Sequence, residues 1–345
     1  MNDRMASLVS ALRADVDAMC LPDGRMVGSP GHGVVRERLA RRLREIGCEP
    51  WSNRTFELPY ANGGASFCNL IGVIKGRNPR LAPILLGAHY DSAIAAPCAD
   101  DNAAAVAIAL AVGERVAESP ALEHDLVVAL FDAEEPPYFR SPMMGSIRFW
   151  EDQRNGRPVH AAVIMDLVGH DVVIESVARG PIASLNQLLA PLLFITGTES
   201  HPGLRRVHER AGTVDSLSLV LTLNRYVGDM SDHGIFRANG VPYFFLSCGH
   251  WPHYHQDTDT PDFLNYEKMD RIARQVLACA AALNGAELPQ TGNEQFAETL
   301  DLEISRLRVA LGSGWKPVLE GCGLEAVTSR CEMDRLVSSL QRLGI

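Results

Sequence analysis

The stretch Leu126-Val127-Val128-Ala129-Leu130-Phe131-Asp132-Ala133-Glu134-Glu135 places a wholly apolar run directly before a group of acids. An apolar run of this length without polar alternation is typical of a strand that is buried on both faces of a parallel sheet. Ligand sites in open α/β sheets form just beyond the carboxyl ends of such strands. The stretch therefore predicts an α/β fold with an acidic site at the end of this strand.

Other segments repeat this alternation of short apolar strands and helices. Further strands are expected at Glu49 to Leu58, Asn69 to Lys75, Ile84 to Ala88, Ala161 to Leu167 and Val241 to Leu246. Helical spacing marks residues 3 to 20, Val34 to Ile46, Asn102 to Ala117, Met144 to Asp152, 180 to 194, Ser231 to Asn239 and Glu267 to Asn284, while 200 to 230 is ambiguous. The pattern predicts a three-layer α/β/α sandwich around a mostly parallel mixed sheet.

The composition changes after residue 285. A stretch rich in Pro, Gln, Thr, Gly and Asn leads into two helical patterns, about Glu294 to Leu311 and Met333 to Leu343. We expect residues 1–285, with the N-terminal helices, to form the catalytic domain and residues 286–345 to form a helical C-terminal extension. This extension packs on the sheet, forms a dimer contact or shapes the mouth of the site, and the sequence leaves these alternatives open.

The overall composition is that of a soluble globular protein: of 345 residues, 46% are hydrophobic and 21% charged. The net charge of -10 argues against nucleic-acid binding, which requires a basic stripe. No apolar run approaches the roughly 20 residues that span a membrane, and no secretory signal is evident, so we expect a cytoplasmic protein. The eight cysteines are dispersed without a C-x-x-C motif, which argues against a structural zinc cluster.

Histidine and acidic residues cluster at the ends of the expected strands. His89 directly follows Ile84 to Ala88, and a carboxylate two residues later, Asp91, can orient its ring through the second nitrogen. Asp100 and Asp101 precede an apolar helix, where aspartate is a favoured N-cap. One of the two can also bridge metals, and the two interpretations are compatible.

The remaining candidates complete a set suited to a hydrolytic metal site. Asp166 ends an apolar strand, where an unpaired carboxylate is costly to bury, and His255 follows the strand Val241 to Leu246. Zinc binds imidazole nitrogen and carboxylate oxygen, and a catalytic site leaves one position open for water. In the acidic pair, Glu135 can then bind metal while Glu134 takes the proton of that water.

The segment Ser231-Asp232-His233 looks like a fragment of a serine-hydrolase triad. A serine hydrolase of this fold class requires a G-x-S-x-G nucleophile elbow, which the sequence lacks. We therefore interpret the segment as a supporting feature of the site or a helix start.

In their order and context, several motifs resemble those of the two-zinc α/β aminopeptidases, a family that also includes glutamate carboxypeptidase-type enzymes and has the glutaminyl cyclases as relatives. The resemblance covers about residues 27 to 285. Its motifs are Gly28-Ser29-Pro30-Gly31, Gly87-Ala88-His89-Tyr90-Asp91-Ser92, Ala99-Asp100-Asp101-Asn102, Phe131-Asp132-Ala133-Glu134-Glu135, Gly145-Ser146, Asp166-Leu167-Val168-Gly169, Ser231-Asp232-His233 and His255 with Asp259-Thr260.

The resemblance implies a role for each matching residue. It implies two zinc ions per chain, with His89 and Asp166 on one, Glu135 and His255 on the other, and Asp100 bridging them. Glu134 would be the general base and Asp91 would orient His89. A cis peptide between Asp100 and Asp101 is also implied.

The sequence therefore predicts a metallopeptidase: a zinc-dependent hydrolase of peptide or small amide substrates, with an aminopeptidase favoured. The alternative is a glutaminyl cyclase-type acyltransferase, because Asp166-Leu167 and the long segment from Pro136 to Met144 resemble the cyclase arrangement more closely. A non-catalytic binding protein is disfavoured because the expected ligands and base are all present.

Aromatic and histidine side chains near the expected site are candidates for substrate binding. They are Tyr254, Trp251, Tyr138 and His253, with Phe139 as a further aromatic. We expect no nucleic-acid or membrane partner, and we expect a homo-oligomer, if one forms, to use the C-terminal helices.

Overall fold

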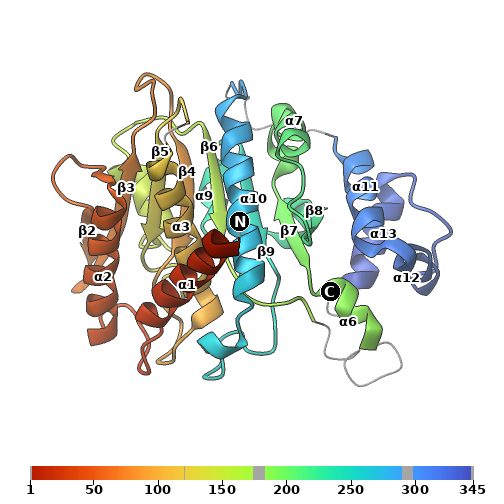
Figure 1. Ribbon diagram of the computed structural model, residues 1–345, viewed down its shortest axis with the longest axis horizontal. Helices are drawn as coiled ribbons and strands as arrows, with labels where there is room; N and C mark the ends of the chain where they lie inside the picture. Colours follow the sequence, from red (N-terminus) through yellow and green to blue (C-terminus); the bar gives the residue numbers. More distant parts are fainter. Residues whose placement is uncertain (1, 120, 174–182, 290–297, 343–345) are drawn as a thin grey trace.

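The computed structural model describes residues 2–119, 121–173, 183–289 and 298–342, and its central feature is a nine-stranded mixed sheet (Figure 1). The strand order is β1-β3-β5-β4-β6-β9-β7-β8, with β2 paired to β3 outside this path. The strands are β1 Glu49–Pro50, β2 Glu57–Asn62, β3 Ala65–Ile74, β4 Ile84–His89, β5 Leu126–Phe131, β6 Ala161–Met165, β7 Leu192–Thr196, β8 Ser218–Thr222 and β9 Tyr243–Ser247.

The middle of the sheet is parallel. Strands β5, β4, β6 and β9 run in the same direction, whereas β3 is antiparallel to β5 and β7 is antiparallel to β9. Alternate residues of β5 enter two separate hydrophobic clusters, with Val128 in one and Val127 in the other. An apolar side chain is needed on both faces, which explains the uninterrupted apolar sequence of these strands.

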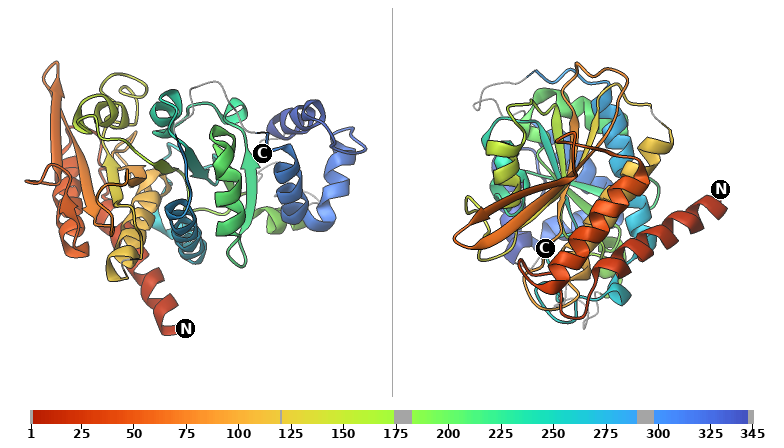
Figure 2. Two further views of the ribbon diagram at one scale, coloured as in Figure 1. Left: turned by 90° about the horizontal axis from the view of Figure 1, so that it is seen from above. Right: turned by 90° about the vertical axis from the view of Figure 1, so that its left-hand side faces the viewer.

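Helices cover both faces of the sheet, as the view from above in Figure 2 shows. One face carries α1 Asn2–Met19, α2 Pro30–Ile46, α3 Ala104–Glu118, α7 Pro202–Ala211 and α10 Tyr266–Asn284, and the other carries α4 Gly145–Arg148, η2 Phe149–Gln153 and α9 His233–Ala238. The shorter elements are η1 Ala99–Ala103, α6 Ala183–Leu189, η3 Thr198–Ser200, α8 Asn224–Val227 and η4 Pro261–Phe263. This arrangement confirms the predicted α/β/α sandwich.

The ends of α2 show how local sequence sets an element. The Ser29 side chain accepts a hydrogen bond from the His32 backbone N–H, and Pro30 occupies the first turn, where its missing N–H costs nothing. The helix ends at Gly47, whose φ of 87° is a left-handed conformation that glycine adopts without strain.

The sequence prediction was wrong in the second half of the sheet. The helix expected over 180 to 194 forms at Ala183–Leu189, residues 180–182 lie outside the described residues, and residues 192–196 form strand β7. The ambiguous segment 200–230 contains α7, β8 and α8. The run Leu192-Leu193-Phe194-Ile195-Thr196 is short and apolar, so periodicity alone does not separate a buried strand from a helix. The strand expected at Glu49 to Leu58 is divided into β1 and the start of β2.

The C-terminal residues lie against the β8 edge of the sheet (Figure 1). They form α11 Leu300–Leu311, η5 Gly312–Gly314, α12 Trp315–Gly321 and α13 Arg330–Arg342, and α12 was not predicted. Leu302, Leu307 and Leu336 belong to the same hydrophobic cluster as β7 and β8. The extension therefore packs on the sheet, while the division into domains at residue 285 stays a prediction.

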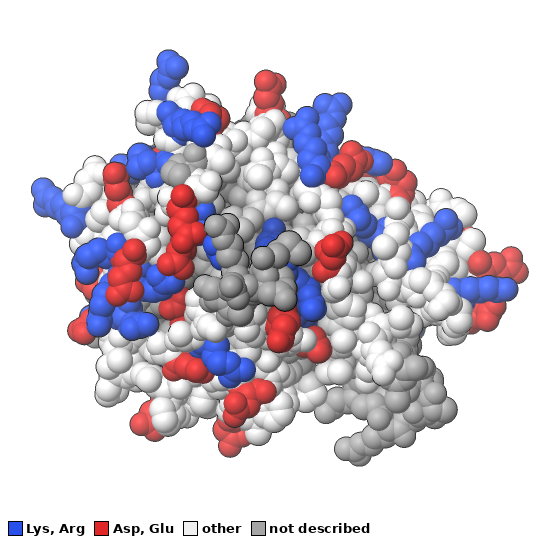
Figure 3. Space-filling view, viewed as in Figure 1, with Lys and Arg blue, Asp and Glu red and all other residues white. Residues whose placement is uncertain are grey.

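Two surface properties bear on the expected partners. None of the helices among the described residues combines the length and apolarity that crossing a membrane requires. On the face shown in Figure 3, basic and acidic side chains are interspersed, and its described residues form no continuous basic stripe.

The contact between α7 and the C-terminal helices contains a titratable probe. Burial, with a smaller contribution from the charge of Arg306 on α11, lowers the pKa of His208 on α7 to about 4. Histidine has an ordinary pKa of about 6.5, so below this pH His208 is protonated in the unfolded chain but stays neutral in the folded protein. The unfolding free energy therefore decreases as the pH falls from 6.5 toward 4. We expect His208 to contribute a loss of up to about 3 kcal/mol in unfolding free energy over this range.

Urea unfolding at a series of pH values, compared between the parent protein and His208→Gln, measures this contribution. The variant has no imidazole to titrate, so its unfolding free energy should decline less steeply below pH 6.5. Parallel pH profiles for the two proteins would contradict the assignment.

Candidate metal centre

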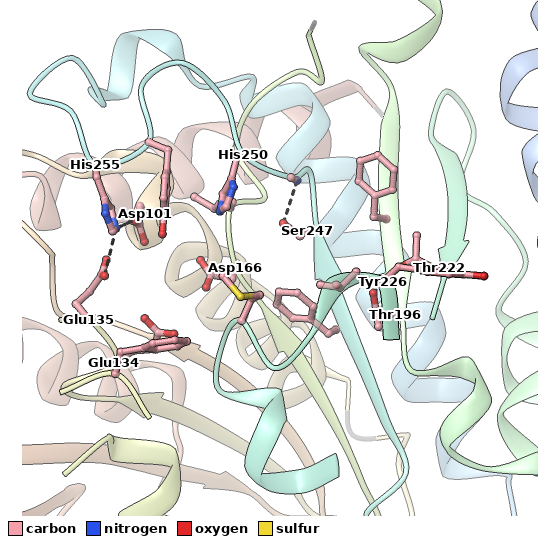
Figure 4. Close-up of a pocket in the computed structure, with 18 of the residues that line it drawn as sticks. Asp101, Glu134, Glu135, Asp166, Thr196, Thr222, Tyr226, Ser247, His250 and His255 are labelled. Carbon is pink, nitrogen blue, oxygen red and sulfur yellow. Dashed lines mark hydrogen bonds and ion pairs between the residues drawn. The ribbon is translucent and has the colours of Figure 1, made fainter. Parts of the chain in front are cut away.

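The parallel strands bring distant side chains together because their carboxyl ends meet at one edge of the sheet. His89 is the last residue of β4, Asp166 follows β6, and the Glu134-Glu135 pair lies in the loop after β5. His255 lies in the loop after β9. The structure thus brings five sequence-predicted residues to one place (Figure 4 labels four of them).

One carboxylate lies between the two histidines. Asp101 Oδ1 is 3.3 Å from His89 Nε2, and Asp101 Oδ2 is 3.1 Å from His255 Nε2. Asp166 Oδ1 is 3.6 Å from His89 Nε2, and Glu135 Oε2 is 3.2 Å from His255 Nε2. Both histidines therefore face Asp101, and each faces at least one further carboxylate.

The sequence prediction assigned this central position to the wrong aspartate. Asp100 turns away from the histidines: its Oδ1 accepts the Gly169 N–H at 2.6 Å, and its Oδ2 lies 2.6 Å from His170 Nδ1. The non-proline cis peptide is also one residue later than predicted, between Asp101 and Asn102. Neighbouring aspartates have the same chemistry, so only the backbone path through η1 decides which one enters the cluster.

Two buried side chains fix that backbone path. Arg25 donates hydrogen bonds to the carbonyls of Tyr90, Pro97, Cys98 and Asp101. Asp259 accepts the backbone N–H groups of Asp100 and Asp101 at 2.9 and 3.1 Å. The sequence motifs included Asp259, but nothing in the sequence indicated Arg25, whose partners lie more than sixty positions away.

Asp91 holds the other side of the cluster. Its two carboxylate oxygens accept the backbone N–H groups of Glu134 and Glu135, each at 3.1 Å, and its Oδ1 lies 3.3 Å from His89 Nδ1. This position matches the predicted orienting role. It also ties the loop that carries the acidic pair to the end of β4.

The nitrogen and oxygen atoms at the centre of the cluster fit a bound cation. Within the described part of the chain, His89 Nε2, Asp101 Oδ2, Glu134 Oε1, Glu135 Oε1, Asp166 Oδ1 and His255 Nε2 are buried without a hydrogen-bond partner. Two groups of potential ligand atoms lie within 4.8 Å of one another, His89-Asp101-Glu135 and His89-Glu134-Asp166. Unpartnered buried charges are costly, and binding a divalent cation removes that cost.

The electrostatics of the cluster agree with this interpretation. Burial raises the pKa of Glu135 to about 8 and raises that of Glu134 well above its ordinary value, with neighbouring carboxylates adding to both shifts. Burial would lower the pKa of His89, but Glu134 and Asp166 outweigh it and raise that pKa well above its usual value. The neighbouring carboxylates of Asp101 and Glu135 raise the pKa of His255 to about 10. Excess negative charge in this pocket therefore attracts positive charge.

Asp232 is a buried acid that sequence reasoning underestimated. It belongs to the Ser231-Asp232-His233 segment, and both its carboxylate oxygens are buried without a hydrogen-bond partner among the described residues. Burial raises its pKa to about 7, and the charges of His89 and Asp166 also act on it. The lack of a nucleophile elbow excluded a serine triad, but the sequence did not show that Asp232 lies close to the cluster of His89 and Asp166.

A cavity of about 560 Å³ opens beside the cluster. Tyr254 lines it as predicted, and Phe139 does so too. Among the described residues that line it, Trp251, Tyr138 and His253 do not appear, which corrects their assignment to the substrate pocket.

These three side chains pack elsewhere. Trp251 stacks on His170 at 4.6 Å between ring centroids, and His253 stacks on Phe263 at 4.4 Å. Tyr138 packs edge-on against Phe67. Their proximity to site residues in sequence therefore did not place them in the cavity.

Comparison with known proteins places the fold and the family. The model of peptidase family M28 matches residues 69–280, more than half of the chain. The uncharacterized protein YfbL of Escherichia coli K12 is 27% identical over 214 residues, which are 56% of this chain and 65% of that protein. The chain thus spans just under two thirds of this curated relative.

Solved structures share the fold at low sequence identity. The Legionella pneumophila LapA aminopeptidase superposes with a TM-score of 0.61 and 17% identity, covering 84% of this chain and 75% of LapA. The Porphyromonas gingivalis glutaminyl cyclase gives a TM-score of 0.58 and 17% identity, covering 80% of this chain and 96% of the cyclase.

The different environments of the two neighbouring aspartates yield a direct test. Asp101→Asn should lower zinc affinity at least about tenfold more than Asp100→Asn, because only Asp101 faces both histidines. Asp100→Asn should instead lower the unfolding free energy by about 1–3 kcal/mol, because it weakens buried hydrogen bonds to Gly169 and His170. Zinc titration and urea unfolding of both variants make the measurement, and the opposite order of zinc affinities would overturn the assignment.

Proposed function

The chain belongs to peptidase family M28, and we propose that it is a zinc-dependent hydrolase that acts as an aminopeptidase. The observation that carries this proposal is the position of Asp101 between His89 and His255, with buried acids on both sides. A shared carboxylate flanked by two imidazoles is a donor set suited to a pair of divalent cations.

We assign two zinc ions to these donors. His89, Asp166 and one oxygen of Asp101 would hold the first, and His255, Glu135 and the other oxygen of Asp101 would hold the second. When bound, zinc supplies Lewis acidity, which polarises the substrate carbonyl and makes water a stronger acid.

Glu134 is assigned as the general base. Its Oε2 lies 3.8 Å from His89 Nε2, and its Oε1 is buried without a partner, free to accept a proton. Asp91 fixes the backbone of the Glu134-Glu135 pair through both N–H groups. Glu134 would take a proton from the attacking water and return it to the departing amine.

The charge of the cavity favours a substrate with a free amine. The charged side chains that line the cavity among the described residues are acidic, apart from His250 and His255, and no Lys or Arg lines it. A substrate carboxylate near the scissile bond would therefore find no cationic side chain to pair with among these residues. This argues for an aminopeptidase over a carboxypeptidase-type enzyme.

A glutaminyl cyclase-type acyltransferase is the second candidate function. Phe139 supports it, because this residue of the long Pro136 to Met144 segment lines the cavity. Parallel assays with an aminoacyl anilide and a glutaminyl peptide, together with zinc stoichiometry, separate the two reactions.

Two wider expectations belong to this proposal. A cytoplasmic location is part of this proposal. If it forms a homo-oligomer, we assign the contact to α11–α13, where Val309 is 72% exposed.

Glu134→Gln tests the assignment of the base. Glutamine keeps the size of the side chain but cannot accept the proton, so kcat should fall by about 10²–10⁴-fold. Zinc content, measured by elemental analysis after dialysis, should equal that of the parent protein. Glu151→Gln is the matched control, because Glu151 is exposed, and it should leave kcat unchanged.

The paired readouts distinguish base from ligand. If Glu134→Gln lost zinc together with activity, Glu134 would be a metal ligand. If it retained full activity, the proposed proton transfer would be wrong. An N-acetylated copy of the best aminoacyl substrate should be cleaved poorly, since it lacks the amine.

A further inference from the structure

The cavity beside the metal centre has two unlike ends. Figure 4 shows Asp101, Glu134, Glu135, Asp166 and His255 at one end and Thr196, Thr222 and Tyr226 at the other. Between them the walls are mostly apolar and include Leu167, Phe245 and Val227, together with Ser247 and His250. A volume of about 560 Å³ is that of a site for a drug-sized ligand, larger than one ordinary side chain requires.

A second cavity of about 90 Å³ lies beyond the far end. It is enclosed between strands β7 and β8 and the C-terminal helices, and its walls include Leu192, Val220, Leu307, Val337 and Leu340. Enclosed apolar cavities exclude water and accept apolar groups.

Among the described residues that line this second cavity, Glu303 is the one acid, and its carboxylate is already paired. Glu303 accepts hydrogen bonds from the Thr299 hydroxyl at 2.6 Å and from Arg330 at 2.7 and 2.9 Å. Its charge therefore does not require solvent or a polar ligand, and an alkyl chain can pass it without leaving an unpaired charge.

The two cavities share walls. Phe194, Thr222 and Tyr226 line both of them. The Thr222 hydroxyl is paired with that of Thr196 at 2.6 Å, so neither hydroxyl requires water or a polar ligand. The side chains of Phe194, Thr222 and Tyr226 thus form the partition between the two cavities.

The C-terminal extension forms the far side of this partition. Gln341 of α13 lines the first cavity and donates a hydrogen bond to the Tyr226 carbonyl at 3.0 Å, while the Tyr226 hydroxyl donates to Asp334. The helices α11–α13 therefore hold α8 in place and close the space into which a substrate would extend.

We infer that the two cavities form one specificity channel for a long unbranched apolar side chain on the residue that carries the free amine and the carbonyl of the scissile amide. This inference rests on the proposed function and adds the substrate class. The reacting amide lies at the acidic end, and the chain crosses the partition at Phe194 and Tyr226 to end beneath the C-terminal helices.

Binding of linear 1-aminoalkanes, from butylamine to dodecylamine, tests the channel without requiring turnover. Calorimetric titration of the zinc-loaded protein should show affinity rising about fourfold per added methylene, as expected for burial of a CH₂ group. The rise should continue past the length that fills the first cavity. An affinity that stops rising at pentylamine would overturn the inference.

Two variants shorten the channel from its far end. Val337→Phe and, independently, Leu340→Phe place a larger apolar side chain in the second cavity. Each should lower the affinity ratio of dodecylamine to pentylamine at least about tenfold, because several methylenes lose their site. Val309→Phe on the exposed face of α11 is the matched control and should leave the ratio at the parent value.

Kinetics with aminoacyl anilides of increasing linear side chain separate this inference from the proposed function. A kcat/KM that rises from norvaline to 2-aminodecanoic acid in the parent, and levels off in Val337→Phe, supports both. Cleavage that peaks at norleucine, with the same profile in Val337→Phe, overturns the channel and leaves the aminopeptidase assignment intact. Chain-length-dependent amine binding without cleavage of any anilide supports the channel and overturns the reaction.

Discussion

The backbone of residues 97–102 is the constraint on which the site depends. Arg25 donates to four carbonyls around it, and Asp259 accepts two of its N–H groups. Both side chains are fully buried, so these hydrogen bonds form where competing water is absent. They present Asp101 to both histidines while Asp100 faces His170. A shift of one residue would replace Asp101 at the centre with the amide of Asn102 or with Asp100, whose carboxylate now binds Gly169 and His170.

The sequence predicted the parts of the site that depend on strand ends. His89, Asp166 and the Glu134-Glu135 pair follow apolar strands, and parallel pairing alone brings them to one edge. It did not identify Asp101, because the choice between neighbouring aspartates is made by long-range hydrogen bonds from Arg25 and Asp259. Local sequence patterns do not predict hydrogen bonds between residues that are far apart in the chain.

The substrate cavity was less predictable for a different reason. Its far wall comes from β7, β8 and α8, in the part of the chain where short apolar runs left helix and strand unresolved. Trp251 and His253, near His255 in sequence, instead stack on His170 and Phe263. The open question about the C-terminal extension has a partial answer, because Gln341 reaches the cavity and α11 packs on the sheet.

The contrast between the two ends of the cavity fixes how a substrate can lie. The buried charged and polar atoms of the cluster make that end favourable for polar groups, so an alkyl chain gains nothing there. Among the described residues, the opposite end offers mostly apolar walls, and its hydroxyls and the Glu303 carboxylate are already paired, so an ammonium group would be desolvated without a free partner. A molecule with an amine at one end and an apolar chain at the other therefore has one favourable orientation. In an aminoacyl amide with a long apolar side chain, that orientation places the amide bond next to Glu134 and the histidines.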